Sequence, residues 1–294
     1  MVKFFFNLSL LLLLLSMISP CYSASNSNFK IIPSKTTIEM GKFLSVKLVY
    51  TGDELPGKAN LQGWYREFFV NHQSIDDENL TNGLLKQTEI VHLYPRRSGN
   101  LVLHALALGG AIARPISIKV TDAIRKGING TPIWQGVPDK PIWQGETIQI
   151  SIVQKLLQTS NQVTVEKVNF PSFVVKSLAQ EKTPDEVKIR WLLTAQKSGF
   201  ISLEPPKIIQ RGRGRWRFHL PYITINVKPL PSYIPPTVPV GHLSLSAYLD
   251  DKNNRPFWLV EIKNSSLLME EVYGIRTQIA KKMGVLLADI QLSK

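Results

Sequence analysis

Two segments 100 residues apart share one pattern, and this repeat constrains the fold more than any other feature. RRSGNLVLHALAL (96–108) and QKSGFISLEPPKI (196–208) each contain a basic residue, then Ser-Gly, then alternating apolar residues. Each segment follows a strand-like run and precedes a run of period two, RPISIKV (114–120) in the first case and LPYITINV (220–227) in the second. Self-similarity at a fixed spacing indicates that one structural unit is used twice.

The beginnings of the two units also match. IEMGKFLSVKLVY (38–50) corresponds to IWQGETIQISIVQ (142–154), and both continue with the alternation of a β-strand that has one buried face. Short strands, turn residues between them and about 100 residues per unit are typical of an immunoglobulin-like β-sandwich. We therefore predict a mainly β protein with tandem immunoglobulin-like β-sandwich domains at 29–123 and 133–229.

The tetrapeptide Ile-Trp-Gln-Gly occurs twice, at 133–136 and 142–145. The second copy aligns with the start of the first unit, so we expect it to form the opening strand of the second domain. The first copy has no counterpart in that alignment. It is either a segment that lies along an edge strand or a chance repetition, and we prefer chance.

The remaining C-terminal sequence changes character. Five prolines in the stretch that ends at Gly241 predict a stiff, extended linker at 230–241. The final segment, 242–294, contains two strand-like runs and then apolar residues at helical spacing between 265 and 284. We expect a short α+β unit there, in which the helix covers an open sheet face or, alternatively, docks a partner.

The N-terminus has the pattern of an export signal. Lys3 precedes an apolar run at 4–18, and small residues follow, so we expect a signal peptide at 1–23. The alternative is that the segment is retained as an anchor. Cys21 is the single cysteine, so the exported domains would rely on core packing without disulfides. We predict an exported protein in the periplasm or on the periplasmic face of the inner membrane.

Motifs that carry chemistry are absent from the sequence. We find no phosphate-binding loop, nucleophile elbow or cysteine pairs with metal-ligand spacing. We therefore predict a protein that is not an enzyme and has no cofactor. If the Ser-Gly turn after residue 97 closes a hairpin, His92 and His104 lie opposite each other, which makes them weak candidates for a metal site.

An arginine-rich run, RGRGRWRF (211–218), is the most distinctive candidate site. In an extended strand Arg211, Arg213, Arg215 and Arg217 share one face, and guanidinium groups in a row can bind anions or a partner, with Trp216 beside them. The alternative is a hairpin tip kept soluble by charge. The net charge of +13 also favours an anionic binding partner. Because the protein is exported, we expect an anionic membrane surface or acidic partners and no nucleic acid.

Several of these patterns together resemble the BatD, or oxygen-tolerance, family of bacterial envelope proteins. They are LYPRRSG (93–99), LPYITINVKPLP (220–231) and PPTVPVGHLSLSA (235–247), combined with the export signal and the spacing of the units. The resemblance extends from residue 29 to about residue 262. It rests on spacing patterns and brings no catalytic residue with it.

The resemblance implies an envelope protein that works through protein–protein contacts. It would act with von Willebrand A-type Bat proteins of the membrane and a MoxR-type ATPase in aerotolerance and stress resistance. Family members usually end in a transmembrane helix, whereas this sequence has no apolar run near 20 residues after residue 20. The alternative function is a module that binds envelope polysaccharide or an anionic surface through Trp64, Trp134, Trp143 and the arginine strip.

Overall fold

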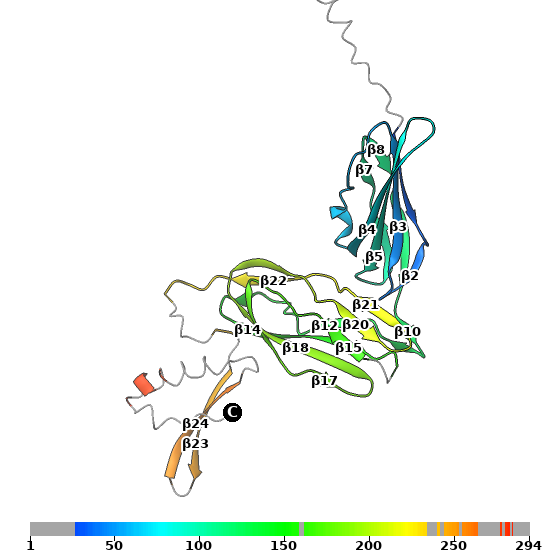
Figure 1. Ribbon diagram of the computed structural model, residues 1–294. Helices are drawn as coiled ribbons and strands as arrows, with labels where there is room; N and C mark the ends of the chain where they lie inside the picture. Colours follow the sequence, from blue (N-terminus) through cyan, green and yellow to red (C-terminus); the bar gives the residue numbers. More distant parts are fainter. Residues whose placement is uncertain are drawn as a thin grey trace, which may run out of the picture.

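The computed structural model is almost entirely β, as the sequence predicts (Figure 1). The expected signal peptide (1–23) and most of the expected helix (265–284) lie outside the residues that the structure describes. Those residues are 27–158, 162–233, 240–241, 244–252, 255–263, 277, 280–282 and 284.

The first module, coloured blue to cyan in Figure 1, comprises β1 to β9. One sheet has the order β1-β3-β5-β4, the facing sheet has the order β2-β9-β6, and β7 and β8 form a separate two-stranded hairpin. The elements are β1 (Asn28–Pro33), β2 (Thr37–Glu39), β3 (Leu44–Gly52), the 3-10 helix η1 (Gln62–Trp64), β4 (Phe68–Asn79), β5 (Leu85–Pro95), β6 (Gly99–Leu103), β7 (Leu106–Leu108), β8 (Ala111–Ala113) and β9 (Ile116–Thr121).

The second module, coloured green to yellow, comprises β12 to β22. One sheet has the order β12-β14-β18-β16 with β17 on β18, and the others have the orders β13-β22-β19 and β15-β20-β21. The strands are β12 (Ile133–Gln135), β13 (Ile142–Trp143), β14 (Thr147–Lys155), β15 (Gln162–Val165), β16 (Phe173–Ser177), β17 (Glu181–Lys182), β18 (Glu186–Ala195), β19 (Gly199–Leu203), β20 (Ile208–Arg211), β21 (Arg215–Phe218) and β22 (Ile223–Lys228). Between the modules, β10 (Ile124–Arg125) and β11 (Ile128–Asn129) form a small hairpin.

The repeated Ser-Gly pair has the same role in both modules. Gly99 and Gly199 have φ of 108° and 114°, a conformation that glycine adopts at little cost. In the first module the turn leads from β5 to β6, and in the second it leads from β18 to β19. The two strands that each turn joins belong to different sheets, so the turn carries the chain across the sandwich.

The two Ile-Trp-Gln-Gly copies are the two halves of one split first strand. β12 pairs antiparallel with β14, and β13 pairs parallel with β22. In the first module β1 pairs antiparallel with β3, and β2 pairs parallel with β9. The chance interpretation of the first copy is therefore wrong. The chain starts on the edge of one sheet as β12 and then moves to the other sheet as β13, so it forms two short strands in succession. Gly136 and Gly145, with φ of 75° and 86°, follow these two strands.

The core follows the predicted alternation in β3. Leu44, Val46 and Leu48 are at most 1 % exposed, and they line the inner face of the sheet. In β14 the polar face is buried as well, contrary to the half-buried strand that the sequence suggests. Cross-strand partners satisfy that face, as when the hydroxyl groups of Thr147 and Thr194 lie 2.7 Å apart.

The C-terminal segment contains the two strands that the sequence predicts there. β23 (Ser244–Lys252) and β24 (Arg255–Lys263) pair antiparallel along their whole length. Of the expected helix, positions 277, 280–282 and 284 are described; 277 and 280–282 are helical, and 284 is in a turn. Among the residues that the structure describes, no helix has the length and apolar character needed to cross a membrane.

The modules meet where the turn after β2 rests on β21. Gly41 in this turn has φ of 79°, and its carbonyl oxygen accepts a hydrogen bond of 2.8 Å from the backbone N–H of Arg217. A Cβ added to Gly41 would lie 2.8 Å from the ring of Phe218 and 2.9 Å from the Cβ of Trp216. We call the set of contacts between the two modules the junction.

The Gly41→Ala substitution tests this close approach. Gly41 and Gly145 occupy corresponding turns, before β3 and β14 respectively, and both have φ above zero. A Cβ added to Gly145, however, would meet its nearest atom at 3.6 Å. Alanine costs about 1 kcal/mol at either site for the left-handed backbone, and only at Gly41 does it also displace buried aromatic rings. We expect a loss of about 2–4 kcal/mol in the free energy of unfolding in urea for Gly41→Ala and about 1 kcal/mol for Gly145→Ala. Equal losses would show that the modules do not pack as described.

Candidate functional site

The predicted pair of histidines does not form. β5 pairs with β3 and β4, while β6 pairs with β9, so His92 and His104 lie on different sheets. The His92 ring packs against the ring of Phe43, with 4.2 Å between centroids, and His104 is exposed. Within the described ranges, no group of three or more His, Cys, Asp or Glu side chains is placed to hold a metal ion. The prediction failed because it assumed a hairpin at a turn that crosses between sheets.

The arginine-rich run forms the hairpin β20–β21. Arg211 lies directly opposite Arg215, and Arg213 lies in the tip between them, so all three side chains are exposed. Arg217 is half-buried and donates a hydrogen bond of 3.0 Å to the hydroxyl of Tyr94 in the first module. Trp216 is only 3 % exposed, so its predicted place in an accessible strip is wrong. Alternation turns this ring inward, and the first module covers it.

Two cations from outside the hairpin cover Trp216. Lys42 Nζ lies 4.5 Å from the ring centroid, and Arg125 Cζ lies 5.8 Å from it. Lys42 Nζ also donates a hydrogen bond of 2.8 Å to the carbonyl oxygen of Arg215, and Arg125 forms an ion pair of 2.8 Å with Glu39. We call the resulting surface the basic face; its members are Lys35, Lys42, Arg125, Lys126, Arg211, Arg213 and Arg215, with the acids Glu39 and Asp122 beside them.

The electrostatics of the basic face combine partial burial with charges of both signs. Partial burial lowers the pKa of Lys42; the carboxylate of Glu39 opposes this change, and the charges of Arg125 and Lys35 add to it.

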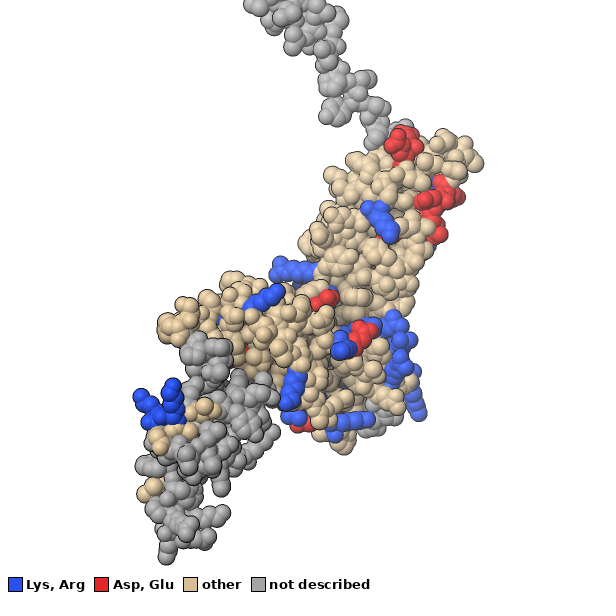
Figure 2. Space-filling view, turned by 60° about the vertical axis from the view of Figure 1, so that its left-hand side comes forward, with Lys and Arg blue, Asp and Glu red and all other residues tan. Residues whose placement is uncertain are grey.

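The second module carries most of the excess positive charge of the two modules. Residues 133–229 contain 14 Lys and Arg against seven Asp and Glu, whereas 29–123 contain 11 against nine. Figure 2 shows the basic groups gathered on the second module and the acidic groups toward the far end of the first.

Arg96 joins the two modules from within. Its side chain is 2 % exposed, and its guanidinium donates to the carbonyl oxygens of Tyr65 at 3.0 Å and Leu220 at 2.9 Å. It also donates to the hydroxyl of Tyr222 at 3.2 Å and lies 3.8 Å from Glu204. Tyr65 belongs to the first module and the other three residues to the second, so one buried cation bridges the junction.

An aromatic cluster surrounds His219 next to Arg96. The rings of His219 and Phe69 stack with centroids 3.9 Å apart and planes 7° from parallel, and Tyr94 lies 5.2 Å away. Burial lowers the pKa of His219 to about 3, and the charges of Arg96, Lys207 and Arg217 contribute to the shift. His219 is therefore neutral at physiological pH and serves the junction as an aromatic ring.

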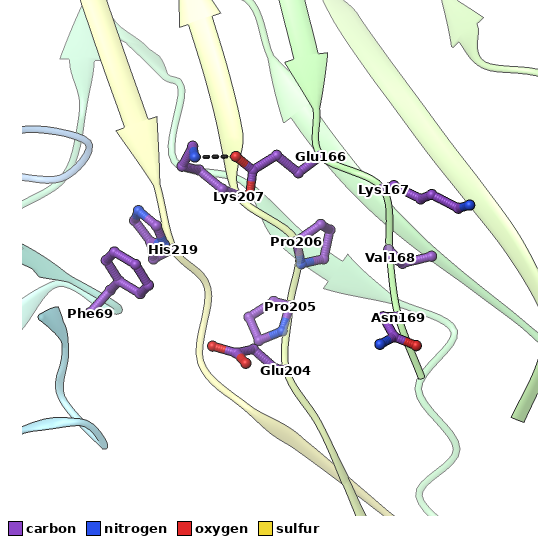
Figure 3. Close-up of a pocket in the computed structure, with 10 residues that line it drawn as sticks. All are labelled: Phe69, Glu166, Lys167, Val168, Asn169, Glu204, Pro205, Pro206, Lys207 and His219. Atoms are coloured by element: carbon purple, nitrogen blue, oxygen red, sulfur yellow. Dashed lines mark hydrogen bonds and ion pairs between the residues drawn. The ribbon is translucent and has the colours of Figure 1, made fainter. Parts of the chain in front are cut away.

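A shallow cleft of about 280 Å³ opens beside this cluster (Figure 3). Its walls are the segments 166–169 and 204–207, and Phe69 and His219 lie at one end. Lys207 and Glu166 form an ion pair across it, and Glu204 accepts a hydrogen bond of 3.2 Å from the Tyr222 hydroxyl. Lys207, Glu166 and Glu204 thus have partners within the protein.

Sequence reasoning missed the cations that come from outside the arginine run. Lys42 stands in a turn and Arg125 ends the short strand β10, and nothing near them in the sequence indicates that they meet Trp216. Arg96 did carry a signal, because it opens the first RRSG repeat where the second unit has Gln196. The difference between the copies marks the residue that the first unit uses for docking.

Comparison with known proteins found no matching family model and no matching curated protein. Solved structures that match part of this chain include InvD of Yersinia pseudotuberculosis, which is 11% identical with a TM-score of 0.21; the match covers 76% of this chain and 63% of InvD. The adhesin InvE of the same organism is 13% identical with a TM-score of 0.22, covering 69% and 59% respectively. Domains 5-6 of the S-layer protein SbsC are 12% identical with a TM-score of 0.18, covering 69% and 98%. The chain spans less than two thirds of both Yersinia proteins.

Replacing Arg96 tests whether it holds the modules together. Arg96→Met removes three charge-assisted hydrogen bonds and leaves the buried carbonyl of Leu220 without its donor, so docking should weaken by about 2–4 kcal/mol. Small-angle scattering should then show a larger maximum dimension. Arg97→Met is the matched control, because the neighbouring side chain is 50% exposed and its ion pair with Glu67 contributes at most about 1 kcal/mol. An unchanged scattering profile for Arg96→Met would contradict the bridging role.

Acid should weaken the protein through His219. A base whose pKa falls on folding binds fewer protons in the native state, so its stabilising contribution is complete above about pH 6.5 and is lost as the pH falls toward 3. Below about pH 6.5 we expect the free energy of unfolding to fall because of this group, with a slope that approaches about 1.4 kcal/mol per pH unit near pH 5. Urea titrations of His219→Phe, which keeps the stack on Phe69, should show a smaller fall. An identical pH profile for His219→Phe and the unchanged protein would contradict the assignment.

Proposed function

We propose that this chain is a non-enzymatic envelope protein of the BatD oxygen-tolerance type, which binds partner proteins through two sandwich modules held in a fixed arrangement. The observation that carries the proposal is the junction around Arg96. A buried guanidinium with directional partners in both modules fixes their relative orientation, so that the chain presents one continuous surface to a partner.

Edge strands supply places where a partner can add a strand. β12 and β19 are terminal strands of their sheets in the second module. Ile133 on β12 is 54 % exposed and Phe200 on β19 is 80 % exposed, so each edge also presents an apolar side chain. Backbone groups of an edge strand provide affinity for an added strand, and side chains of this kind provide selectivity.

The partners that we propose follow from the family resemblance. They are von Willebrand A-type membrane proteins that act with a MoxR-type ATPase in stress tolerance, met on the periplasmic side of the inner membrane. An interaction role also fits the cleft beside His219, where Lys207 is paired with Glu166 and Glu204 is bonded to Tyr222.

A binding experiment with cell envelopes tests this proposal. The tagged full chain is cross-linked in envelope extracts, and we expect von Willebrand A-type proteins among those recovered. Phe200→Lys places a charge on the exposed edge of β19 and should lower their recovery at least tenfold. Ile112→Lys is the control, because Ile112 is 73 % exposed on β8 of the other module. Recovery without von Willebrand A-type proteins, or equal recovery with Phe200→Lys, would overturn the proposal.

The alternative of polysaccharide binding through tryptophan rings loses Trp64, while Trp134 and Trp143 are partly exposed and have contacts within the protein. Trp64 is fully buried and donates to the carbonyl oxygen of His104 at 3.0 Å, and Trp134 donates to Pro221 at 3.3 Å. Lys228 lies over the ring of Trp143, 5.5 Å from its centroid. The part of the alternative that an observation favours is binding to an anionic surface, because the basic face is exposed and extended.

A further inference from the structure

We propose that the basic face and the β10–β11 hairpin together bind the surface of a bilayer that contains anionic phospholipid. This inference gives the second candidate function a location and a ligand. It does not depend on the protein partners proposed above, because it concerns a different surface from the edges of β12 and β19.

The cations of this surface come from three separate parts of the chain. Lys42 belongs to the first module, Arg125 to the β10–β11 hairpin, and Arg215 to the β20–β21 hairpin. They meet around Trp216, where Lys42 and Arg125 lie over the ring and Lys42 bonds to the backbone of Arg215. The surface therefore exists only when the two modules are docked.

The positive charge of the basic face alone would allow it to bind any polyanion. The exposed apolar side chains of the β10–β11 hairpin favour a bilayer. Ile124 and Ile128 on this hairpin are 50 % and 36 % exposed, and Ile128 lies directly opposite Arg125. The turn consists of Lys126 and Gly127, with φ of 51° and 77°, which makes the hairpin tight and holds its side chains at the surface. Exposed aliphatic groups beside cations are the pattern of interfacial binding, in which the cations bind headgroups and the aliphatic groups enter the boundary of the acyl chains.

The acidic groups at this surface do not cancel its charge. Glu39 pairs with Arg125, and Asp122 accepts a hydrogen bond of 3.5 Å from the hydroxyl of Thr131. The remaining cations include Arg211, Arg213 and Arg215, which are exposed and for which the structure gives no acidic partner among the described residues. Guanidinium groups suit the phosphate oxygens of lipid headgroups because of their planar, forked geometry.

A fluorescent probe on the β10–β11 hairpin tests the proposal in the full chain. Cys21→Ser removes the single cysteine, and Ile128→Cys then allows the hairpin to be labelled with an environment-sensitive dye. We expect a blue shift and an increase in emission with vesicles of phosphatidylcholine and phosphatidylglycerol and little change with phosphatidylcholine alone. The same dye on Ile112→Cys, which lies on the first module, should not respond. An equal response there would show that the apolar N-terminal segment holds the vesicle, and the proposal would fail.

Removal of the arginines tests the electrostatic part. In the labelled chain, Arg211→Gln, Arg213→Gln and Arg215→Gln together should raise the lipid concentration needed for half of the response by about 100-fold, at about fivefold per residue. Lys176→Gln, Lys182→Gln and Lys197→Gln remove the same charge from other exposed positions of the second module and should have little effect.

Three outcomes would overturn the proposal. The first is equal weakening by the two triple variants, which would reduce the effect to net charge. The second is the absence of any response of the dye at position 128 to anionic vesicles. The third is loss of the response when soluble polyglutamate is added at low concentration, because this would identify an acidic polypeptide as the preferred ligand of the basic face.

Discussion

The buried guanidinium of Arg96 is the constraint on which the arrangement of the modules depends. Removal of a charge from water costs several kcal/mol, and only well-placed partners recover that cost. The partners of Arg96 lie in fixed directions, toward Tyr65 in its own module and toward Leu220 and Tyr222 in the other. Apolar contacts alone would allow the modules to slide or rotate, since the hydrophobic effect has no direction. A planar donor with partners on both sides selects one orientation.

The other features of the junction follow from that orientation. With the modules fixed, the Gly41 turn lies on Trp216 and Phe218, and the stack of Phe69 on His219 is enclosed. His219 stays neutral because burial in this enclosed space lowers its pKa, and the neighbouring cation Arg96 adds to the shift. The basic face depends on the same geometry, because its cations come from separate parts of the chain. One docking event thus organises an aromatic core inside and a charged surface outside.

Much of the fold could be predicted because alternation and repetition are local properties of a sequence. The buried residues of β3 and the two matched units were readable from period two and from the 100-residue spacing. The errors arose where one sequence pattern is compatible with two different strand pairings. Two strand-like runs around Ser-Gly look alike whether the turn closes a hairpin or crosses to the other sheet, so His92 and His104 were placed together incorrectly. The repeated Ile-Trp-Gln-Gly could not be interpreted without knowing that the first strand is divided between sheets.

The candidate site was less predictable because its contacts join residues far apart in the chain. Arg96 and Leu220 are separated by 124 positions, and alternation reports which face a residue occupies but not what lies opposite. The repeat itself nevertheless contains a rule for the junction. The glycine turn that receives Trp216 and Phe218 in the first module has its counterpart at Gly145, where Leu230 and Val240 lie within 3.7 Å of a built Cβ. Each module thus uses the same turn to contact a part of the chain that lies beyond that module. The partners differ because the first module is followed by the second module, whereas the second module is followed by a proline-rich segment.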